Sequence, residues 1–278
     1  MALFRTLPGG RPQIVKDEAF CELLNNEMPN NGKSYSELFE EFDSAIREQD
    51  SSITTGALSN SHGDWYEWLL AVNAWNVFVE AENANLGVLL PNVSSLDVSE
   101  LYQNDLCGLI DDLRTKVAES AGVEFISSNP DFVMIDRELV TRQLSRTTRI
   151  TEINIDTIRF LQSLYQNFVG HCGFEDILGY VSVKTSLRPD RRLQISHECS
   201  LMKALYVHLQ TRKWIINPPG LKYYAIATSV GPSDRSALKT VATHSITTVH
   251  SIPQAAVDEV YEVNSSQRAL DVFSEILL

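Results

Sequence analysis

Lys184 and Glu198, in the stretch 179–208, could together act on a phosphodiester. The apolar, β-branched residues 180–183 predict a short strand that ends at Lys184. Pro189 suits the first turn of a helix, because its φ fits there and its missing N–H would have no partner. Glu198 then lies two turns into that helix. A cation beside a phosphate and a carboxylate that holds Mg²⁺ are the groups that metal-assisted phosphodiester hydrolysis requires.

A second carboxylate, Asp131, and a serine on the predicted strand, Ser182, extend this candidate site. Asp131 follows a proline at the mouth of another predicted strand. Alternation along a strand places Ser182 and Lys184 on one face. Glu198 comes seven residues after Arg191, about two helical turns or ~10.5 Å, so both should point the same way. Taken singly, these residues also fit a turn aspartate, a surface lysine and a solvated helix glutamate, so the catalytic interpretation depends on their combination.

The start of the same predicted helix could read base pairs. Arginine suits the O6 and N7 acceptors of guanine, and aspartate can accept from the N4 amine of cytosine. Arg188, Asp190 and Arg191 could therefore read adjacent G and C pairs in a major groove, with Arg192 as a phosphate contact or surface cation. The alternative is that Asp190 caps the helix and the arginines are solvated.

The net charge and its distribution along the chain point to different conclusions about a nucleic-acid partner. A net charge of −13 argues at first sight against a nucleic-acid partner. Residues 184–222, however, hold eight Lys and Arg against two acidic residues, whereas residues 17–50 hold ten acidic residues against two basic ones. An acidic flank around a basic groove would make affinity depend more on base contacts. A solvated acidic helix face explains the acidic stretch equally well.

Composition favours one globular domain. The chain has 278 residues and 44% hydrophobic content, and we expect a single domain with a helical N-terminal subregion (1–60) and a catalytic and recognition core (61–278). The most apolar segment, 65–81, contains two Glu and two Asn, which indicates a buried helix, not a membrane span. The first residues lack a secretory pattern, so we expect a cytoplasmic protein without a membrane partner. Its four scattered cysteines are expected to be reduced and mostly buried.

Periodicity and capping signals predict a mixed central β-sheet flanked by helices, an α/β fold. The stretch 1–15 is expected to be an irregular arm, 51–63 a polar loop and 137–150 a surface excursion. Strands are predicted at 123–126, 131–135, 180–183 and 221–230, the last in the middle of the sheet. Helices are predicted at 34–49, 64–83, 97–120, 154–169, 190–210, 253–262 and 265–277. In the helix at 190–210, Leu193, Leu201, Leu205 and Leu209 should form one apolar stripe.

Several strings in the chain resemble one enzyme family. SNPDFVMID, SVKTSLRPDRRLQ and HECSLMKALYVHLQTR are similar to type II restriction endonucleases of the PD-(D/E)XK superfamily that cut sites centred on CCGG, the BsrFI-type enzymes. GDWYEWL, YYAIATSVG and KTVATHSIT extend the similarity over most of the chain beyond residue 60. The resemblance implies the fold of these endonucleases.

The resemblance also implies roles for individual residues. Asp131 and Glu198 would ligate Mg²⁺, and Lys184 would be the active-site lysine. Ser182 stands where the usual motif has its acid, which Glu198 would supply from the helix instead. Glu67 would be an additional acidic residue at the metal site; by itself it is a charge among Trp and Leu residues, either paired in the core or functional. Cys199 stands where the family pattern has Gly.

The activity that the resemblance implies is a Mg²⁺-dependent double-strand break in DNA at a palindrome containing CCGG, with R/CCGGY as the full site and 5′-phosphate ends. A palindrome requires at least a homodimer, and similar enzymes suggest a homotetramer with Trp214 at the dimer–dimer interface; a core tryptophan is the competing interpretation. A cognate DNA methyltransferase would belong to the same system. The alternative from another class is a sequence-specific DNA-binding protein without cleavage activity, whose carboxylates are only structural pairs.

Overall fold

A five-stranded mixed sheet forms the centre of the computed structural model, which describes residues 3–6, 12–30, 32–125, 129–145, 147–247 and 252–278. The strand order is β3-β4-β5-β6-β7. The pairs β3–β4 and β4–β5 are antiparallel, whereas β5–β6 and β6–β7 are parallel, which confirms the predicted α/β fold with a mixed sheet. The strands are β3 (Leu86–Leu89), β4 (Phe132–Ile135), β5 (Ile177–Lys184), β6 (Lys222–Ala227) and β7 (Glu259–Glu262).

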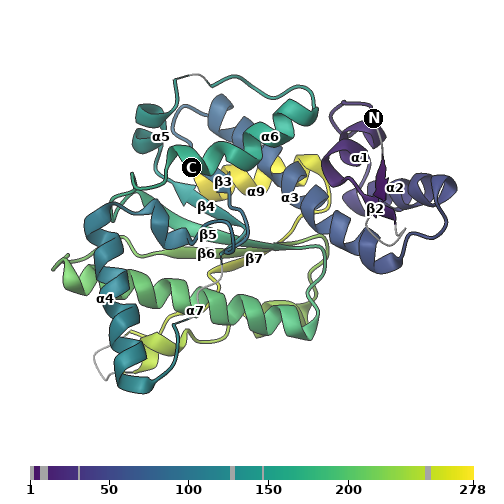
Figure 1. Ribbon diagram of the computed structural model, residues 1–278. Helices are drawn as coiled ribbons and strands as arrows, with labels where there is room; N and C mark the ends of the chain where they lie inside the picture. The colour runs from purple at the N-terminus through teal and green to yellow at the C-terminus, as the bar shows by residue number, and fades with distance from the viewer. Residues whose placement is uncertain (1–2, 7–11, 31, 126–128, 146, 248–251) are drawn as a thin grey trace.

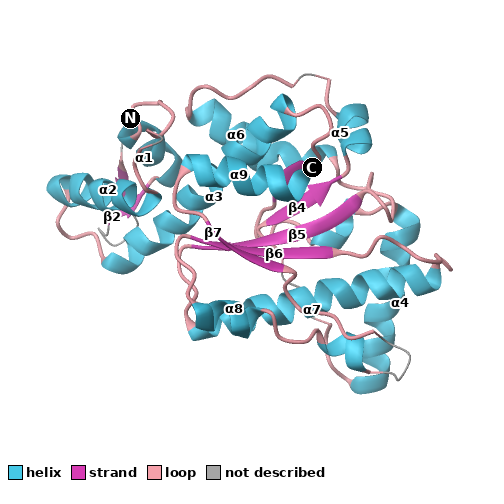
Figure 2. Ribbon diagram, turned by 180° about the vertical axis from the view of Figure 1, so that it is seen from behind, coloured by secondary structure: helices cyan, strands magenta, loops and turns pink. Residues whose placement is uncertain are grey.

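Helices cover both faces of this sheet (Figures 1 and 2). One face carries α3, α6 and α9, and the other carries α7 and α8, with α4 packed beside α7. The N-terminal elements β1, β2, α1 and α2 gather at one end of α3, to the side of the sheet. The bounds are β1 (Phe4–Thr6), β2 (Pro12–Ile14), α1 (Lys16–Leu23), α2 (Tyr35–Gln49), α3 (Thr55–Glu80), α4 (Asn104–Ala121), α5 (Arg137–Gln143), α6 (Ile155–Ser163), α7 (Pro189–Arg212), α8 (Pro232–Leu238) and α9 (Ser266–Leu277).

Capping side chains begin several helices where the sequence predicts them. Ser34 caps α2 in a capping box with Glu37, and Asn154 and Ser265 cap α6 and α9. Asp97 caps only a short 3₁₀ turn, Val98–Leu101, and α4 begins separately at Asn104. The single helix expected over 97–120 is therefore wrong at its start.

Helix α3 begins at Thr55, nine residues before the predicted start at 64. The Ser, Thr and Gly content of this stretch is typical of a loop, but the Thr54 hydroxyl accepts the Ala57 N–H at 3.2 Å and caps the helix. Leu58 and Ser61 are buried, so tertiary packing stabilises these extra turns. The extension matters because it carries Ser59 and Asn60 to the wall of a cavity of about 1080 Å³.

Several other local predictions differ from the structure. Residues 259–262, expected to be helical, form strand β7 beside β6, with Tyr224 opposite Glu259. The expected N-terminal arm contains the antiparallel pair β1–β2. Residues 137–143 form α5, although 137–150 was expected to be an excursion. Of the predicted strand 123–126, residues 123–125 are irregular and Ile126 lies outside the described residues.

Helix α7 begins at Pro189 as predicted, but its apolar stripe is shorter than expected. Leu205 and Leu209 are buried against the sheet, whereas the side chain of Leu193 is 75% exposed. The first turns of α7 therefore extend beyond the part of the helix that packs on the sheet. Arg191 and Gln194, in these turns, line the same cavity.

As expected, residues 65–78 form a largely buried part of α3, and the four cysteines are free thiols. Cys21, Cys172 and Cys199 are buried free thiols, and Cys107 is partly buried. Burial raises the pKa of Cys21 to about 11, and it raises the pKa of Cys172 to about 12, so both stay protonated at neutral pH. Within the described part of the chain, no helix has both the length and the apolar composition needed to cross a bilayer.

Candidate active site

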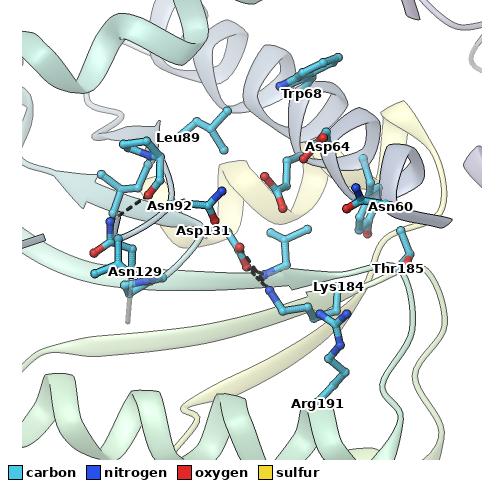
Figure 3. A pocket seen from close by; sticks show the side chains of 18 of the residues that line it. Asn60, Asp64, Trp68, Leu89, Asn92, Asn129, Asp131, Lys184, Thr185 and Arg191 are labelled. Carbon is cyan, nitrogen blue, oxygen red and sulfur yellow. Dashed lines mark hydrogen bonds and ion pairs between the residues drawn. The ribbon is translucent and has the colours of Figure 1, made fainter. Parts of the chain in front are cut away.

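A cavity of about 1080 Å³ opens between α3, the end of β5 and the start of α7. Asp131, Lys184, Glu198, Glu67 and Arg191 all line it, although they come from different stretches of the chain. Figure 3 shows Lys184 and Asp131 in contact at its centre, with Arg191 extending from α7 on one side and Asp64 from α3 on the other. The structure thus brings together the three side chains on which the sequence interpretation depends.

Asp131 and Lys184 form an ion pair at the end of β5. The Lys184 Nζ lies 2.8 Å from Asp131 Oδ2, and the same oxygen accepts the Val183 backbone N–H at 2.5 Å. The Leu90 N–H also donates to the Asp131 carbonyl at 2.9 Å, which fixes the residue between β3 and β4. Burial by itself lowers the pKa of Lys184, but Asp131, Glu67 and Glu198 together raise it above 10.5, so the ammonium stays charged.

Glu67 faces the same pair from α3. Burial is the main reason that its pKa lies well above 4.5, and the negative charge of Asp131 raises it further, against a smaller opposite effect of Lys184. The sequence left open whether Glu67 is a paired core residue or functional; the structure places it on the cavity wall, one helical turn after Asp64. Both burial and the neighbouring negative charge disfavour the ionised form of Glu67.

Glu198 is buried, and hydroxyl groups contact one of its oxygens. Ser182 Oγ donates to Glu198 Oε2 at 2.7 Å, and the Tyr223 hydroxyl donates to the same oxygen at 2.6 Å. Ser182 is fully buried and does not line the cavity. The geometry therefore makes Ser182 a contact of the helix carboxylate.

The donor set suits a hard divalent cation. Four carboxylates, those of Asp64, Glu67, Asp131 and Glu198, line one cavity. After burial, the negative charge of Asp131 is the next cause of the raised pKa of Glu67. The described residues contain no group of three His, Cys, Asp or Glu side chains close enough to cage an ion by themselves. Mg²⁺ is usually bound through one or two carboxylates, with water and substrate phosphates completing its shell, so Asp131 with Glu198 or Glu67 fits this mode.

Two of the three predicted base-reading residues line the cavity. Arg188 and Arg191 line it from the start of α7. Asp190 does not line it; its side chain is exposed, with Oδ2 3.7 Å from an Arg188 nitrogen and 4.0 Å from Arg191 Nε. These long, exposed contacts hold the three side chains loosely, which leaves their polar atoms accessible to a ligand.

The basic excess of residues 184–222 is largely cancelled by partners elsewhere in the fold. Arg192, expected to be a phosphate contact or surface cation, pairs with Asp234 at 2.9 Å. Lys203 is buried and pairs with Asp258 at 2.7 Å. Arg212 pairs with Asp112, and Lys213 lies 2.8 Å from Asp105. The excess of positive charge in this segment is therefore smaller than expected, and of its cations Lys184, Arg188 and Arg191 line the cavity.

Some cavity residues had no signal in the sequence. Lys16 reaches the cavity from the start of α1, where it pairs with Asp64, and its carbonyl accepts the Trp65 indole N–H at 2.9 Å. Asn60, on the unexpected first turns of α3, lies on the same wall (Figure 3). Only the helical spacing of three residues between Asp64 and Glu67 could have indicated that Asp64 shares this site.

Trp214 lies outside the cavity lining, in the turn that follows α7. Its side chain is 89% exposed, and Ile216 beside it is 85% exposed, so the interpretation as a core tryptophan was wrong. Positive φ angles at Trp214 (55°) and Asn217 (56°) shape this turn. An exposed pair of large apolar side chains is typical of a protein–protein contact.

Comparisons with known proteins agree on one family. A family model described as Cfr10I/Bse634I restriction endonuclease matches residues 10–278. The type II restriction enzyme Cfr10I of Citrobacter freundii is 47% identical over 235 residues, which cover 84% of this chain and 81% of that enzyme. The structure of the Type IIF restriction endonuclease Bse634I with cognate DNA matches with a TM-score of 0.89 at 28% identity, covering 100% of this chain and 98% of that one. A second Bse634I structure matches with a TM-score of 0.86 at 30% identity, over 97% of this chain and 95% of that one.

Proposed function

Because the chain belongs to the Cfr10I/Bse634I family of restriction endonucleases and is a type II restriction enzyme, we propose that it makes Mg²⁺-dependent double-strand breaks at a palindrome containing CCGG, with R/CCGGY as the full site. The observation that carries this proposal is the convergence of Asp131, Lys184 and Glu198 on one cavity whose mouth presents Arg188 and Arg191. The similar endonuclease Bse634I has a structure with cognate DNA, which supports double-stranded DNA as the ligand here.

The proposed reaction is in-line hydrolysis without a covalent enzyme intermediate. A water oxygen attacks phosphorus, the P–O3′ bond breaks, and the 3′ oxygen leaves and takes a proton, so the products carry 5′-phosphate and 3′-hydroxyl ends. Mg²⁺ held by Asp131 with Glu198 or Glu67 would supply Lewis-acid stabilisation of the phosphate oxygens. The Lys184 ammonium, held in place by Asp131, would orient the water and neutralise the charge that develops on the phosphate.

In this proposal the start of α7 reads the CCGG core. Arg188 and Arg191 would donate to guanine O6 and N7, and Asp190 would accept from the N4 amine of cytosine. Their placement beside the catalytic cavity supports this assignment, since one helix then carries both base contacts and a carboxylate of the reaction centre. The scissile phosphate and the bases being read would consequently keep a constant spacing.

The protein is proposed to act as a homodimer at minimum, and as a homotetramer in which Trp214 lies between two dimers. A palindrome has two-fold symmetry, and each subunit supplies one active site for one strand. The exposed side chains of Trp214 and Ile216 support the second interface. We also propose that residues 1–278 act as one catalytic unit, with 1–60 as a subregion, and that a cognate DNA methyltransferase protects the host sites.

Trp214→Ala is expected to halve the mass of the assembly from tetramer to dimer, because it removes the largest apolar side chain from the proposed contact. Sedimentation equilibrium measures this mass directly. Leu193→Ala is a matched control, since Leu193 is also exposed but lies at the opposite end of α7. If the parent is a tetramer and Trp214→Ala leaves its mass unchanged, Trp214 is not part of the interface.

Incubation of the protein with plasmid DNA, with Mg²⁺ or with EDTA, tests the proposed function. We expect discrete fragments only with Mg²⁺, and sequencing of their ends gives the recognition site and the cut position together. Retardation of the DNA without cutting would instead support the alternative, a sequence-specific DNA-binding protein whose carboxylates serve as structural pairs. Fragments that do not end at CCGG sites would contradict the proposed recognition sequence.

A further inference from the structure

A buried tyrosine on β6 contacts the carboxylate that α7 brings to the cavity. Tyr223 and Ser182 are both fully buried, and both hydroxyls lie within 2.7 Å of Glu198 Oε2. The two hydroxyl oxygens also lie 2.7 Å from each other. These distances match the short O–H···O⁻ hydrogen bonds that a charged acceptor forms.

The number of protons in this group limits how it can be arranged. Three oxygen–oxygen contacts are shared by two hydroxyl protons, because each of Ser182 and Tyr223 carries one. If one hydroxyl donates to the other, the second must donate to Glu198; otherwise both donate to Glu198. At least one hydrogen bond therefore reaches the carboxylate in every arrangement, and removal of either hydroxyl leaves a single donor.

The backbone of Tyr223 is tied to the same helix. Its N–H donates to Asp258 Oδ2 at 2.8 Å, and Lys203 Nζ donates to that same oxygen at 2.7 Å. Lys203 lies on α7, five residues after Glu198, and is buried. Tyr223 is thus held against α7 at its main chain and contacts Glu198 with its side chain, so the distance between β6 and the carboxylate is set at two points.

We propose that Tyr223 is a positioning residue for Glu198, which holds the carboxylate in the orientation that a divalent cation needs. This inference rests on the proposed role of Glu198 in binding that cation. A carboxylate on a strand is oriented mainly by its backbone, whereas a glutamate that reaches from a helix has three side-chain torsions to restrain. The Tyr223 hydroxyl, together with Ser182, supplies that restraint from the sheet.

Binding of Mn²⁺ to the DNA-free protein, followed by the electron paramagnetic resonance signal of free Mn²⁺, tests this role without any cleavage. Binding that Glu198→Gln removes defines the site. Tyr223→Phe keeps the ring and deletes only the hydroxyl, and we expect it to weaken this binding by about 10-fold, at the lower end of the ~10–100-fold range seen when groups that orient metal ligands are changed. The apparent Mg²⁺ requirement for DNA cleavage should rise by a similar factor.

Tyr180→Phe is the matched control. Tyr180 is a buried tyrosine on the neighbouring strand β5, paired with Tyr223 in the register, but its hydroxyl bonds to Tyr102 instead of Glu198. We expect its affinity for Mn²⁺ to equal that of the parent. A Tyr223→Phe protein whose affinity for Mn²⁺ stays within twofold of the parent overturns the positioning role, and so does an equal loss in Tyr180→Phe, since that loss would come from general destabilisation of the sheet.

Ser182→Ala provides a second test if Tyr223→Phe does not fold. It removes the other donor, and a folded Ser182→Ala protein with unchanged affinity for Mn²⁺ equally overturns the proposal. The double variant removes every hydroxyl donor of the group, so its loss should exceed the product of the two single losses. If the parent binds no Mn²⁺ that Glu198→Gln removes, the proposed metal role of Glu198 fails; if it does and Tyr223→Phe binds equally well, only the positioning role fails.

Discussion

Lys184→Ala is expected to lower the rate of DNA cleavage by at least about 100-fold, the typical effect of removing one group that stabilises charge in a transition state. The ammonium is the cation that contacts Asp131 inside the cavity, and its raised pKa keeps it charged. The chain should still fold, because Asp131 keeps its hydrogen bond from the Val183 N–H. Glu198→Ala should have an effect of similar size, through loss of a carboxylate at the metal site.

Single-turnover cleavage of a plasmid with one CCGG site measures this effect, and DNA binding in EDTA reports whether the fold is intact. Lys222→Ala is the matched control, since Lys222 belongs to the same basic segment but is exposed at the start of β6, outside the cavity. Near-normal turnover of either Lys184→Ala or Glu198→Ala would remove the catalytic assignment. Equal losses in Lys222→Ala would point to a general effect of positive charge on DNA binding.

Arg188→Ala and Arg191→Ala are each expected to reduce discrimination between CCGG sites and random DNA by about 1–3 kcal/mol, roughly 5- to 150-fold. Both side chains line the mouth of the cavity, and their contacts with Asp190 are long enough to be exchanged for contacts with bases. Competition binding in EDTA, with cognate and scrambled duplexes at one salt concentration, measures this ratio.

The control for this pair is Arg212→Ala. Arg212 lies at the far end of α7 and pairs with Asp112, so its loss should leave the ratio unchanged. If Arg188→Ala and Arg191→Ala weaken binding to both duplexes equally, these arginines contact phosphates and do not read bases. Their removal should then lower the slope of log affinity against log salt by about one per residue.

Elements whose signals are local could be predicted from the sequence. The start of α7 follows from Pro189, and the start of α2 follows from the capping box between Ser34 and Glu37. The alternation within β5 predicts Ser182 and Lys184 on one face of the strand; in the structure Ser182 contacts Glu198 on α7, and Lys184 lines the cavity that Glu198 also lines. Strand β7 was misread as a helix, because its only neighbour in the described sheet is β6, which lies more than thirty residues earlier in the chain.

The charge pattern shows the same limit. The sequence correctly located the cations of residues 184–222, but it could not show that Lys203 is neutralised by Asp258 or Arg192 by Asp234, since each pair spans more than forty residues. The sequence likewise could not decide whether Trp214 is buried, because this depends on the turn after α7, which lies at the surface.

The sequence by itself determined which residues are candidates for the proposed chemistry, because Asp131, Lys184 and Glu198 each occur in a short string whose spacing and strand or helix signals are local. Only the tertiary structure decided that these side chains share one cavity with Glu67, Asp64 and Lys16, and that Tyr223 contacts Glu198. The physical reason is that spacing along the chain limits only neighbours within an element, whereas a site between α3, β5 and α7 depends on how three separately formed elements pack.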